Sequence, residues 1–422
     1  MLRETRALLN VKTPMLKVLS VFGTRPEAIK MATLLQQMAR RPDDFVSRVC
    51  VTAQHRQMLD QVLRHFEITP DYDLSVMEDK QSPTQVMAAV LSRLEAVIHE
   101  ERPDWVLVQG DTTTTAAASL AAFHAGACVG HIEAGLRTSD RWQPFPEEVN
   151  RRITSLVADL HFAPTEQARR NLLDEGVPDN CIVVTGNTVI DALRSVLRSS
   201  SLPKEIQALL RRDVRDEGPS SYANALHLMS ESAEQQQQMN SSRPKLILVT
   251  AHRRENFGRP LEQICHALKT LAARYRERIH IVYPVHPNPC VHIPVHRMLS
   301  GLSNITLLKP LDYLPMVHLM SRAYMILTDS GGLQEEAPSL GKPVLVLREL
   351  TERPEAIEMG TARVVGVETS AIVTETARLL EDQAAYREMA QAVDLYGDGR
   401  ASERIIQALL DIQPPNRRDQ IS

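Results

Sequence analysis

The chain of 422 residues carries a formal net charge of −4, and residues of both charges are mixed along it. This length is too great for one ordinary core and suits two domains of typical size. The charge gives no support for nucleic acid or an anionic membrane as the main partner, and no apolar run approaches the ~18 residues needed to span a bilayer.

Short apolar runs alternate with longer helical patterns along the whole chain. Continuous Val/Ile/Leu runs are typical of strands buried on both faces of a parallel sheet. Their alternation with helices predicts an α/β protein with two doubly wound, Rossmann-like domains. The expected strands are 16–22, 46–52, 105–109, 127–132, 160–163 and 181–185 in the first half, and 245–250, 279–284, 304–308, 324–328, 343–347 and 362–366 in the second.

Changes in composition suggest the boundaries between domains. A polar segment with a Gln run at 235–238 cannot bury much surface, so we expect a flexible insertion near 214–243. The expected organisation is a loose leader at 1–14, an N-terminal domain at 15–192, a C-terminal domain at 193–385, and a helix and tail at 386–422 that return toward the first domain.

The cysteines and histidines indicate neither disulfides nor a metal site. Five scattered cysteines include no Cys-x-x-Cys pair, and the histidines lack metal-binding spacing. We therefore assign no metal and take a reducing cytoplasm as the default compartment. The N-terminus also lacks the apolar stretch of a signal peptide. The cysteines are Cys50, Cys128, Cys181, Cys265 and Cys290.

The first strand ends in "VFGTRPEAIKM", which indicates an anion site at a helix start. Gly23 permits a tight turn, Thr24 is a candidate N-cap, and Pro26 and Glu27 suit the first helical turn. Arg25 beside this helix N-terminus strengthens the attraction for anions. The alternative is an ordinary capped helix with a solvated Arg. No G-x-G-x-x-G or Walker A motif is present, which disfavours a dinucleotide or P-loop site.

Acidic residues follow two further strands of the first domain. Asp111 lies in "QGDTTTT", Glu133 in "GHIEAG", and a third acid, Glu147 or Glu148, in "PFPEEVNRR". Crowded carboxylates suit acid/base work because their pKa values are pushed apart. The alternatives are a helix cap for Asp111 and simple surface acids. Three arginines could keep these carboxylates ionised: Arg137, Arg151 and Arg152.

Two strand ends of the second domain indicate a diphosphate site. His252, Arg253 and Arg254 follow the strand 245–250 directly, and the alternative is a solvated basic loop. His286, among prolines, suits a structural role. In "TDSGG" small residues let backbone N–H groups approach a phosphate closely.

Further along this segment, Glu336 can accept hydrogen bonds from vicinal hydroxyls, as on a ribose. Arg348 and Arg353 follow the next strand. The second domain therefore suits a nucleoside diphosphate, and we expect the acids of the first domain to face it across a cleft, as in a nucleotide-sugar enzyme.

In order, these motifs resemble the non-hydrolysing UDP-N-acetylglucosamine 2-epimerases, which share the two-domain GT-B fold. The resemblance runs from about residue 16 to 400. The leader and the insertion depart from it, and "MLKVLSVFGTRPEA" from Met15 already resembles a family N-terminus, so the leader is an upstream-start artefact or a loose tail. The matching segments include "VFGTRPEAIKM", "VTAQHRQMLDQVL", "HIEAGLRT", "PFPEEVNRR", "VTGNTVIDAL", "VTAHRRENFG", "YPVHPNP", "LTDSGGLQEEAPSLGKPVLVLR" and "TERPEA".

The resemblance implies a reaction in which UDP-N-acetylglucosamine loses UDP, forms a 2-acetamidoglucal, and regains UDP as UDP-N-acetylmannosamine. It implies no metal or NAD, a homodimer, and a role in surface polysaccharide synthesis. By motif, Asp111, Glu133 and Glu147 become acid/base candidates that also contact substrate, and His252 the partner of the leaving group. The implied UDP-binding residues are Arg25, Ser330, Gly331, Gly332, Glu336 and Arg353, with Lys30 as a further candidate.

The resemblance also suggests a regulatory site, and two other function classes are compatible with the same motifs. In some bacterial relatives substrate also binds a regulatory site beside the segment that matches Gln54, His55, Arg56 and Gln57, and the alternative is a plain loop. The other function classes are a GT-B glycosyltransferase that uses a UDP-sugar donor and an inactive nucleotide-sugar-binding regulator. The regulator would not need the acids of the first domain.

Overall fold

The computed structural model describes residues 15–52, 56–76, 81–138, 140–198, 244–351, 353–412 and 414. The expected leader at 1–14 and the insertion near 214–243 lie outside the described residues. The described chain divides into two compact units: unit 1 holds the residues up to Ala192 and those from Tyr396 onward, and unit 2 holds Leu193 to Leu395.

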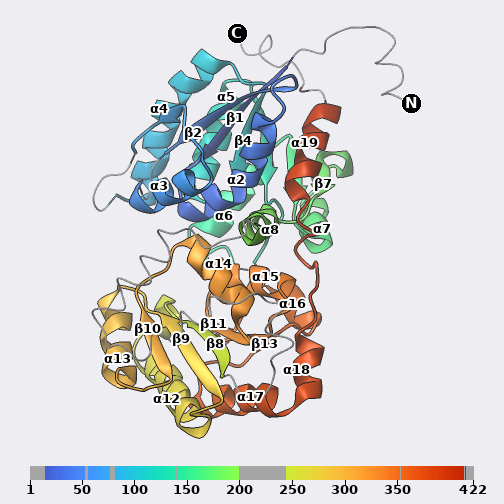
Figure 1. The fold of residues 1–422 in the computed structure, drawn as a ribbon. Coiled ribbons are helices and arrows are strands. Elements are labelled where there is room, and N and C mark those ends of the chain that lie inside the picture. Colours follow the sequence, from blue (N-terminus) through green and yellow to red (C-terminus); the bar gives the residue numbers. More distant parts are fainter. Residues whose placement is uncertain are drawn as a thin grey trace. The chain divides into compact units, whose positions relative to one another are not determined.

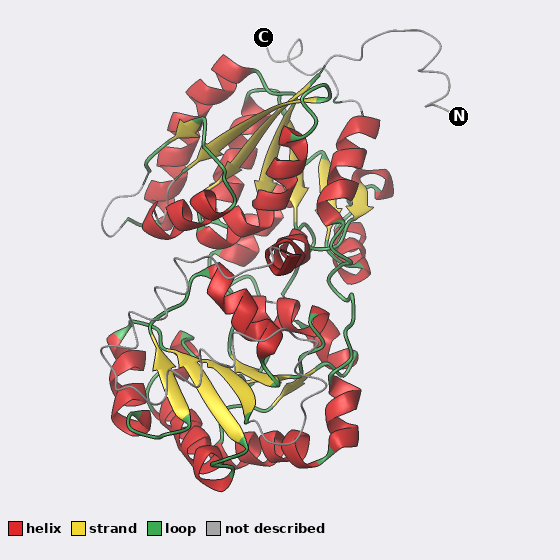
Figure 2. Ribbon diagram, in the orientation of Figure 1, coloured by secondary structure: helices red, strands yellow, loops and turns green. Residues whose placement is uncertain are grey.

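Unit 1 is built on a parallel sheet whose described strands lie in the order β3-β2-β1-β4-β5-β6-β7. The chain starts in the middle, runs to one edge, and then crosses back to build the other half, which is the doubly wound order. Its helices flank the sheet in Figure 2. The strands are β1 (Leu16–Phe22), β2 (Phe45–Val51), β3 (Tyr72–Asp73), β4 (Trp105–Gln109), β5 (Cys128–Ile132), β6 (Leu160–Ala163) and β7 (Ile182–Val184).

The described helices of unit 1 follow the strands in turn (Figure 1). After Tyr396 the chain returns to this unit, where Asp191 accepts hydrogen bonds from the backbone N–H groups of Ala401 (3.1 Å) and Ser402 (2.8 Å). The helices are α2 (Arg25–Ala39), α3 (Arg56–His65), α4 (Pro83–Glu101), α5 (Thr113–His124), α6 (Glu147–Val157), α7 (Glu166–Asp174), α8 (Thr188–Arg198), which runs on into unit 2, and α19 (Ala401–Asp411), with the 3₁₀ turn η1 (Asp179–Cys181).

Unit 2 repeats the design with a parallel sheet whose described strands lie in the order β10-β9-β8-β11-β12-β13. The strands are β8 (Lys245–Thr250), β9 (Ile279–Pro284), β10 (Ile305–Leu308), β11 (Met325–Thr328), β12 (Val344–Val346) and β13 (Ala362–Val364). The helices are α12 (Arg259–Arg274), α13 (Pro289–Leu299), α14 (Tyr313–Arg322), α15 (Gly331–Ser339), α16 (Pro354–Glu358), α17 (Thr369–Glu381) and α18 (Gln383–Met389), with the 3₁₀ turn η2 (Arg254–Asn256).

The structure confirms the predicted α/β class with two doubly wound parallel sheets. Every strand expected from the sequence is present, with ends that differ by at most two residues. The structure adds β3 (Tyr72–Asp73), which pairs with β2 at the edge of the sheet. This two-residue strand, which includes Asp73, is too short and too polar to show as an apolar run in the sequence. The chain returns to unit 1 at Tyr396, later than the expected residue 386.

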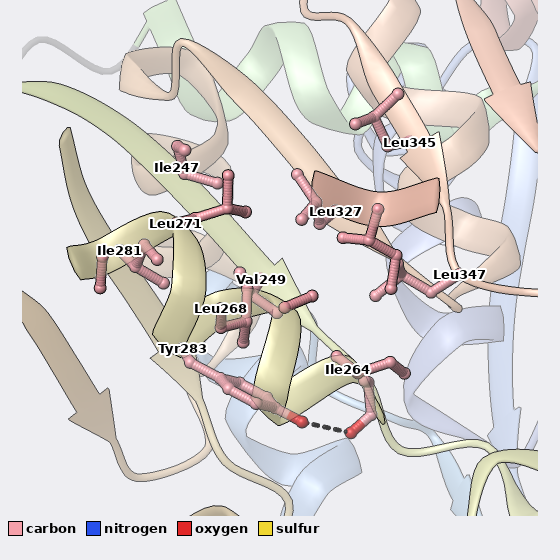
Figure 3. Close-up of a cluster of buried hydrophobic side chains, with 14 of the residues drawn as sticks. Ile247, Val249, Ile264, Leu268, Leu271, Ile281, Tyr283, Leu327, Leu345 and Leu347 are labelled. Atoms are coloured by element: carbon pink, nitrogen blue, oxygen red, sulfur yellow. Dashed lines mark hydrogen bonds between the residues drawn. The ribbon is translucent and has the colours of Figure 1, made fainter. Parts of the chain in front are cut away.

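Alternation along the strands builds a hydrophobic core of unit 2. Ile247, Val249, Ile281 and Leu327 are fully buried and point to one face of the sheet, because successive strand side chains point to opposite faces. Apolar residues of α12, α13 and α17 cover that face. Figure 3 shows part of this cluster, where the Tyr283 hydroxyl donates to a backbone carbonyl oxygen, that of Ala251 (2.7 Å), at the carboxyl edge of the sheet.

Two findings concern the wider surface and chemistry of the described chain. In the part of the chain that the structure describes, no helix has both the length and the apolar character to cross a membrane. The thiols of Cys50, Cys128 and Cys265 are buried, as expected for cysteines within apolar runs, whereas Cys290 is exposed. Burial raises the pKa of Cys50 and of Cys265 to about 12, so these two thiols stay protonated.

Candidate active site

The predicted site residues gather at the carboxyl edges of the two sheets. In each sheet the strand order reverses between two central strands, β1 and β4 in unit 1 and β8 and β11 in unit 2. The loops that follow such a pair leave in opposite directions, which is where open α/β sheets bind ligands. Every candidate in the described chain follows one of these strands or a near neighbour.

The loop after β1 begins α2 as the sequence predicts. Thr24 is the N-cap, its side chain accepts from the Glu27 backbone N–H, and Glu27 completes a capping box. Arg25 is the first residue of the helix and is partly buried. Gly23 is required for space rather than for a positive φ, because a Cβ there would lie 2.0 Å from Thr52 Oγ1.

Glu27 also braces two loops of unit 1, which the sequence did not reveal. One carboxylate oxygen accepts from the backbone N–H groups of Gly23 (3.0 Å) and Thr24 (2.7 Å). The other accepts from the hydroxyls of Thr112 (2.6 Å) and Thr115 (3.2 Å), beyond β4. Burial raises the pKa of Glu27, while these hydrogen bonds act in the opposite direction. The carboxyl group therefore fixes the Arg25 loop against the Asp111 loop.

Glu133 follows β5 in an unusual backbone conformation. Its φ is +66°, in the left-handed region that costs a non-glycine residue free energy and that often marks functional sites. Lys30 Nζ lies 2.5 Å from its carboxylate, and Gln109 Nε2 donates to the same oxygen. The Glu133 side chain is only 6% exposed, so the simple-surface-acid alternative is wrong. Ile132 pairs with Gln109 across the sheet, which is why these side chains meet.

Asp111 is held by the helix that starts with Glu147. Arg151 pairs with the Asp111 carboxylate, and the side-chain amide of Asn150 donates to the Asp111 carbonyl oxygen (3.0 Å). Thr112, rather than Asp111, is the N-cap of α5, so the helix-cap alternative for Asp111 is wrong. The Asp111 side chain is about a third exposed, at 30%, and its carboxylate remains accessible.

The structure separates the two adjacent glutamates at the start of α6. Glu148 is fully buried, pairs with Arg151 (3.0 Å) and Arg152 (2.9 Å), and accepts from the Thr138 backbone N–H (3.1 Å). Glu147 is partly exposed at the first helical position. Glu148 therefore holds the arginines in place, and Glu147 is the less buried of the two acids.

One expected ion pair is wrong. The sequence predicts Arg137, with Arg151 and Arg152, as a partner of the candidate acids, but Arg137 instead pairs with Glu175, the C-cap residue of α7 (2.7 Å). This pairing lowers the pKa of Glu175, mainly through the hydrogen bond from the guanidinium. The sequence could not show this, because Arg137 and Glu175 lie on different elements that meet only in the folded sheet.

In unit 2, His252 is built into a corner around Asp329. Asp329 follows β11, is fully buried, and one of its oxygens accepts from the backbone N–H groups of His252 (2.7 Å) and Arg253 (2.8 Å) and from Asn256 Nδ2 (3.0 Å). Its other oxygen lies 3.3 Å from His252 Nδ1. The His252 ring stacks on that of His286, with centroids 5.5 Å apart. Burial is the main cause that lowers the pKa of His286.

The glycine corner starts α15 as predicted. Ser330 is the N-cap position, and its backbone N–H donates to Thr328 Oγ1 (2.9 Å). Gly331 is buried and Gly332 exposed at the first two helical positions. Glu336 lies one turn further along and is buried beside the Tyr313 phenol. Burial, reinforced by the Glu336 charge, raises the Tyr313 pKa well above its ordinary value, so the phenol stays neutral.

Two guanidinium groups lie over this corner. A Cβ on Gly331 would be 3.7 Å from Arg253 Nη2 and 4.0 Å from Arg353 Nη2. Arg353 is oriented by Glu335 of α15, whose carboxylate lies 2.5 Å from its Nε and is nearly fully buried. A helix N-terminus with two guanidinium groups attracts anions strongly, so this corner suits a phosphate or diphosphate. Arg348 instead pairs with Glu255 (2.7 Å).

The structure does not describe all of the candidates. Gln54 and His55 lie outside the described residues, and Arg56 and Gln57 are placed only as the first backbone positions of α3. The regulatory site therefore stays a prediction, and the plain loop stays its alternative.

Sequence reasoning missed three buried acids that orient the candidates: Glu27, Asp329 and Glu335. One signal was available in the sequence, since Asp329 directly follows an apolar strand. Burial of an ionised group at such a position costs free energy unless the group is paired. The partners of Asp329 lie in the segment that follows another strand, β8, and no local pattern identifies them.

Comparisons with known proteins identify the family to which the chain is similar. A protein-family model described as UDP-N-acetylglucosamine 2-epimerase matches residues 36–410. A "UDP-N-acetylglucosamine 2-epimerase" of Yersinia pestis is 53% identical over 94% of this chain and 99% of its own length. One from Escherichia coli K12 is 52% identical over 93% of this chain and 98% of its own length.

Solved structures show the same likeness. The crystal structure of a UDP-GlcNAc 2-epimerase from Neisseria meningitidis bound to UDP-GlcNAc is 46% identical, covers 94% of this chain and 100% of its own, and superimposes with a TM-score of 0.81. A Methanocaldococcus jannaschii UDP-GlcNAc 2-epimerase in complex with UDP-GlcNAc and UDP is 29% identical, covers 94% and 100%, and has a TM-score of 0.72.

Proposed function

The chain belongs to the non-hydrolysing UDP-N-acetylglucosamine 2-epimerase family, and from this membership we propose how its residues carry out the reaction. A carboxylate of unit 1 removes the proton at C2 while the C1–O bond to UDP breaks, which leaves a 2-acetamidoglucal and UDP. UDP then adds back at C1, and C2 is protonated on the opposite face. The product is UDP-N-acetylmannosamine.

The observation that carries this proposal is the environment of Glu133. The nearly buried Glu133 carboxylate lies next to the Lys30 ammonium at the carboxyl edge of the sheet, and its backbone φ lies in the strained left-handed region. Packing of the core requires neither a charged group nor this backbone conformation there. Asp111 and Glu147 are linked to the same edge through α6. Positioned carboxylates of this kind contribute roughly 10²–10⁴-fold to proton transfer.

Unit 2 supplies the grip on UDP in this proposal. Arg353 and the N-terminus of α15, from Ser330 to Gly332, hold the diphosphate, and Glu336 accepts from the ribose hydroxyls. His252 neutralises the charge that develops on the departing phosphate. Tight retention of UDP keeps the return step effectively intramolecular and prevents loss of the intermediate. Arg25 and Lys30 of unit 1 are proposed as further substrate contacts. We further propose a homodimer in a reducing cytoplasm that serves surface polysaccharide synthesis.

Nuclear magnetic resonance of the protein with UDP-N-acetylglucosamine in deuterium oxide tests the reaction. We expect UDP-N-acetylmannosamine to form without an acceptor and both sugars to gain deuterium at C2, because the base exchanges its proton with solvent before C2 is reprotonated. Epimerisation with full retention of the original hydrogen would contradict solvent-exchanging elimination. A glycosyltransferase would form no mannosamine isomer under these conditions.

Replacement of Gly331 by Val tests the UDP corner. The fold should persist, because a Cβ at this position meets only ordinary contacts with two flexible arginine side chains. The larger side chain keeps the phosphate away from the helix N–H groups, and each lost charge-assisted hydrogen bond costs about 1.5–3 kcal/mol. We therefore expect calorimetry to show UDP binding weakened roughly 10- to 100-fold, with a smaller effect for Gly331→Ala. Unchanged UDP affinity in Gly331→Val would remove this corner from the site.

A further inference from the structure

The corner formed by Asp329 follows from the register of two parallel strands. Thr250 of β8 pairs with Thr328 of β11, so the residues directly after both strands emerge side by side. Asp329 is fully buried there, and its Oδ2 accepts three N–H groups: the backbone of His252 and of Arg253, and the side chain of Asn256. A buried carboxylate with three donors on one oxygen is held in a single orientation.

That orientation directs the second oxygen at the His252 ring. Oδ1 of Asp329 lies 3.3 Å from His252 Nδ1, and the ring stacks on His286 with 10° between the planes. An ionised carboxylate can only accept hydrogen bonds, so the hydrogen of a neutral His252 ring belongs on Nδ1. Nε2 is then the nitrogen directed away from the carboxylate, and the His252 side chain is 39% exposed, which leaves it available to a ligand.

We infer that Asp329 is a positioning residue, which sets both the ring orientation and the tautomer of His252. The inference rests on the proposed role of His252 beside the departing phosphate. Asp329 itself is 0% exposed and does not touch the substrate in this scheme. With Nδ1 facing the carboxylate, Nε2 takes up a proton from solvent and donates it in a hydrogen bond to the departing phosphate oxygen. The orienting carboxylate stabilises the imidazolium that results.

Replacement of Asp329 by Asn makes a specific change. The three donors that face Oδ2 require an acceptor, so the amide oxygen of the new residue should take that position. Asn256 cannot reverse its own amide to relieve this, because its Nδ2 also donates to the Leu347 carbonyl oxygen (3.1 Å). The new NH₂ group then faces His252 Nδ1 and donates to it, which moves the ring hydrogen to Nε2.

The experiment compares His252 in the full-length protein and in Asp329→Asn. Long-range ¹H–¹⁵N spectra of histidine-labelled protein, recorded at alkaline pH, report which ring nitrogen carries the hydrogen, and His252→Gln identifies the signal. We expect hydrogen on Nδ1 in the wild-type protein and on Nε2 in Asp329→Asn. We expect kcat to fall by up to roughly 10²-fold, the size of effect that a misplaced group produces, with a smaller change in UDP affinity.

Asn256→Ala is the matched control. It removes one donor to the same carboxylate oxygen, and with it a brace of the same loop, but leaves the contact of Asp329 with the His252 ring intact. His252 should keep its hydrogen on Nδ1 in this variant, and kcat should fall less than in Asp329→Asn. Equal losses of kcat in the two variants would reduce Asp329 to a structural brace and overturn the inference.

Two further results would overturn it. One is a hydrogen on Nε2 of His252 in the wild-type protein, which can be read even if Asp329→Asn does not fold. The other is a change of tautomer in Asp329→Asn with kcat within about twofold of the wild-type value. If the wild-type protein makes no UDP-N-acetylmannosamine, the proposed function fails, whereas the tautomer measurement still decides what Asp329 does.

Discussion

Glu133→Gln should lower kcat for epimerisation by roughly 10²–10⁴-fold, the usual contribution of a positioned acid or base. The amide keeps the size of the side chain but can neither take nor give the C2 proton. It also leaves the Lys30 ammonium, which lies 2.5 Å from the carboxylate, without that charge partner. The measurement is the steady-state rate of UDP-N-acetylmannosamine formation.

A matched control for this variant is Glu175→Gln. Glu175 is another glutamate of unit 1 that is paired with a cation, but its partner is Arg137 and not Lys30 or Arg151, which hold Glu133 and Asp111. We expect its kcat to stay near the wild-type value. A Glu133→Gln enzyme with wild-type kcat would remove Glu133 from the acid/base set, and an equal loss in Glu175→Gln would point to a general effect on unit 1.

The adjacent glutamates of α6 should respond in opposite ways to the same substitution. Glu148→Gln removes a fully buried charge from between Arg151 and Arg152, and broken buried ion pairs cost roughly 3–5 kcal/mol. The cost should fall at the lower end of that range, because Arg151 keeps its pairing with Asp111 and Arg152 is half exposed. We expect a clear drop in the midpoint of thermal unfolding.

Glu147→Gln should leave that midpoint nearly unchanged and lower kcat by at least about 10²-fold. Calorimetric scans and rates on both variants together decide the assignment. The reverse pattern, with Glu147→Gln unstable and Glu148→Gln inactive but stable, would exchange the roles of the two residues. The loss of Glu148 also frees Arg151 to shift, so some loss of activity in Glu148→Gln is expected alongside its loss of stability.

Much of the fold could be predicted from the sequence because each longer strand is marked by a local run of apolar residues. A continuous run such as residues 105–109 is apolar enough to require burial on both faces, and it is followed by a turn and by a helix cap, Thr112. Alternation of these runs with helices then permits few topologies, because parallel strands need helical crossovers. The two-residue strand β3 could not be predicted because it has too few residues to show any periodicity of apolar side chains.

The sequence also placed Asp111, Glu133, His252 and the 330–332 corner correctly at the ends of strands. What it could not decide was which side chain contacts which. Glu147 and Glu148 are chemically the same and adjacent, and only the direction of α6 buries Glu148 fully while Glu147 stays partly exposed. Asp329 follows its strand by one residue, yet its four contacts reach a segment more than seventy residues earlier in the chain. Register between parallel strands, which is set by the packing of the whole sheet, brings those partners together, and no local pattern carries that information.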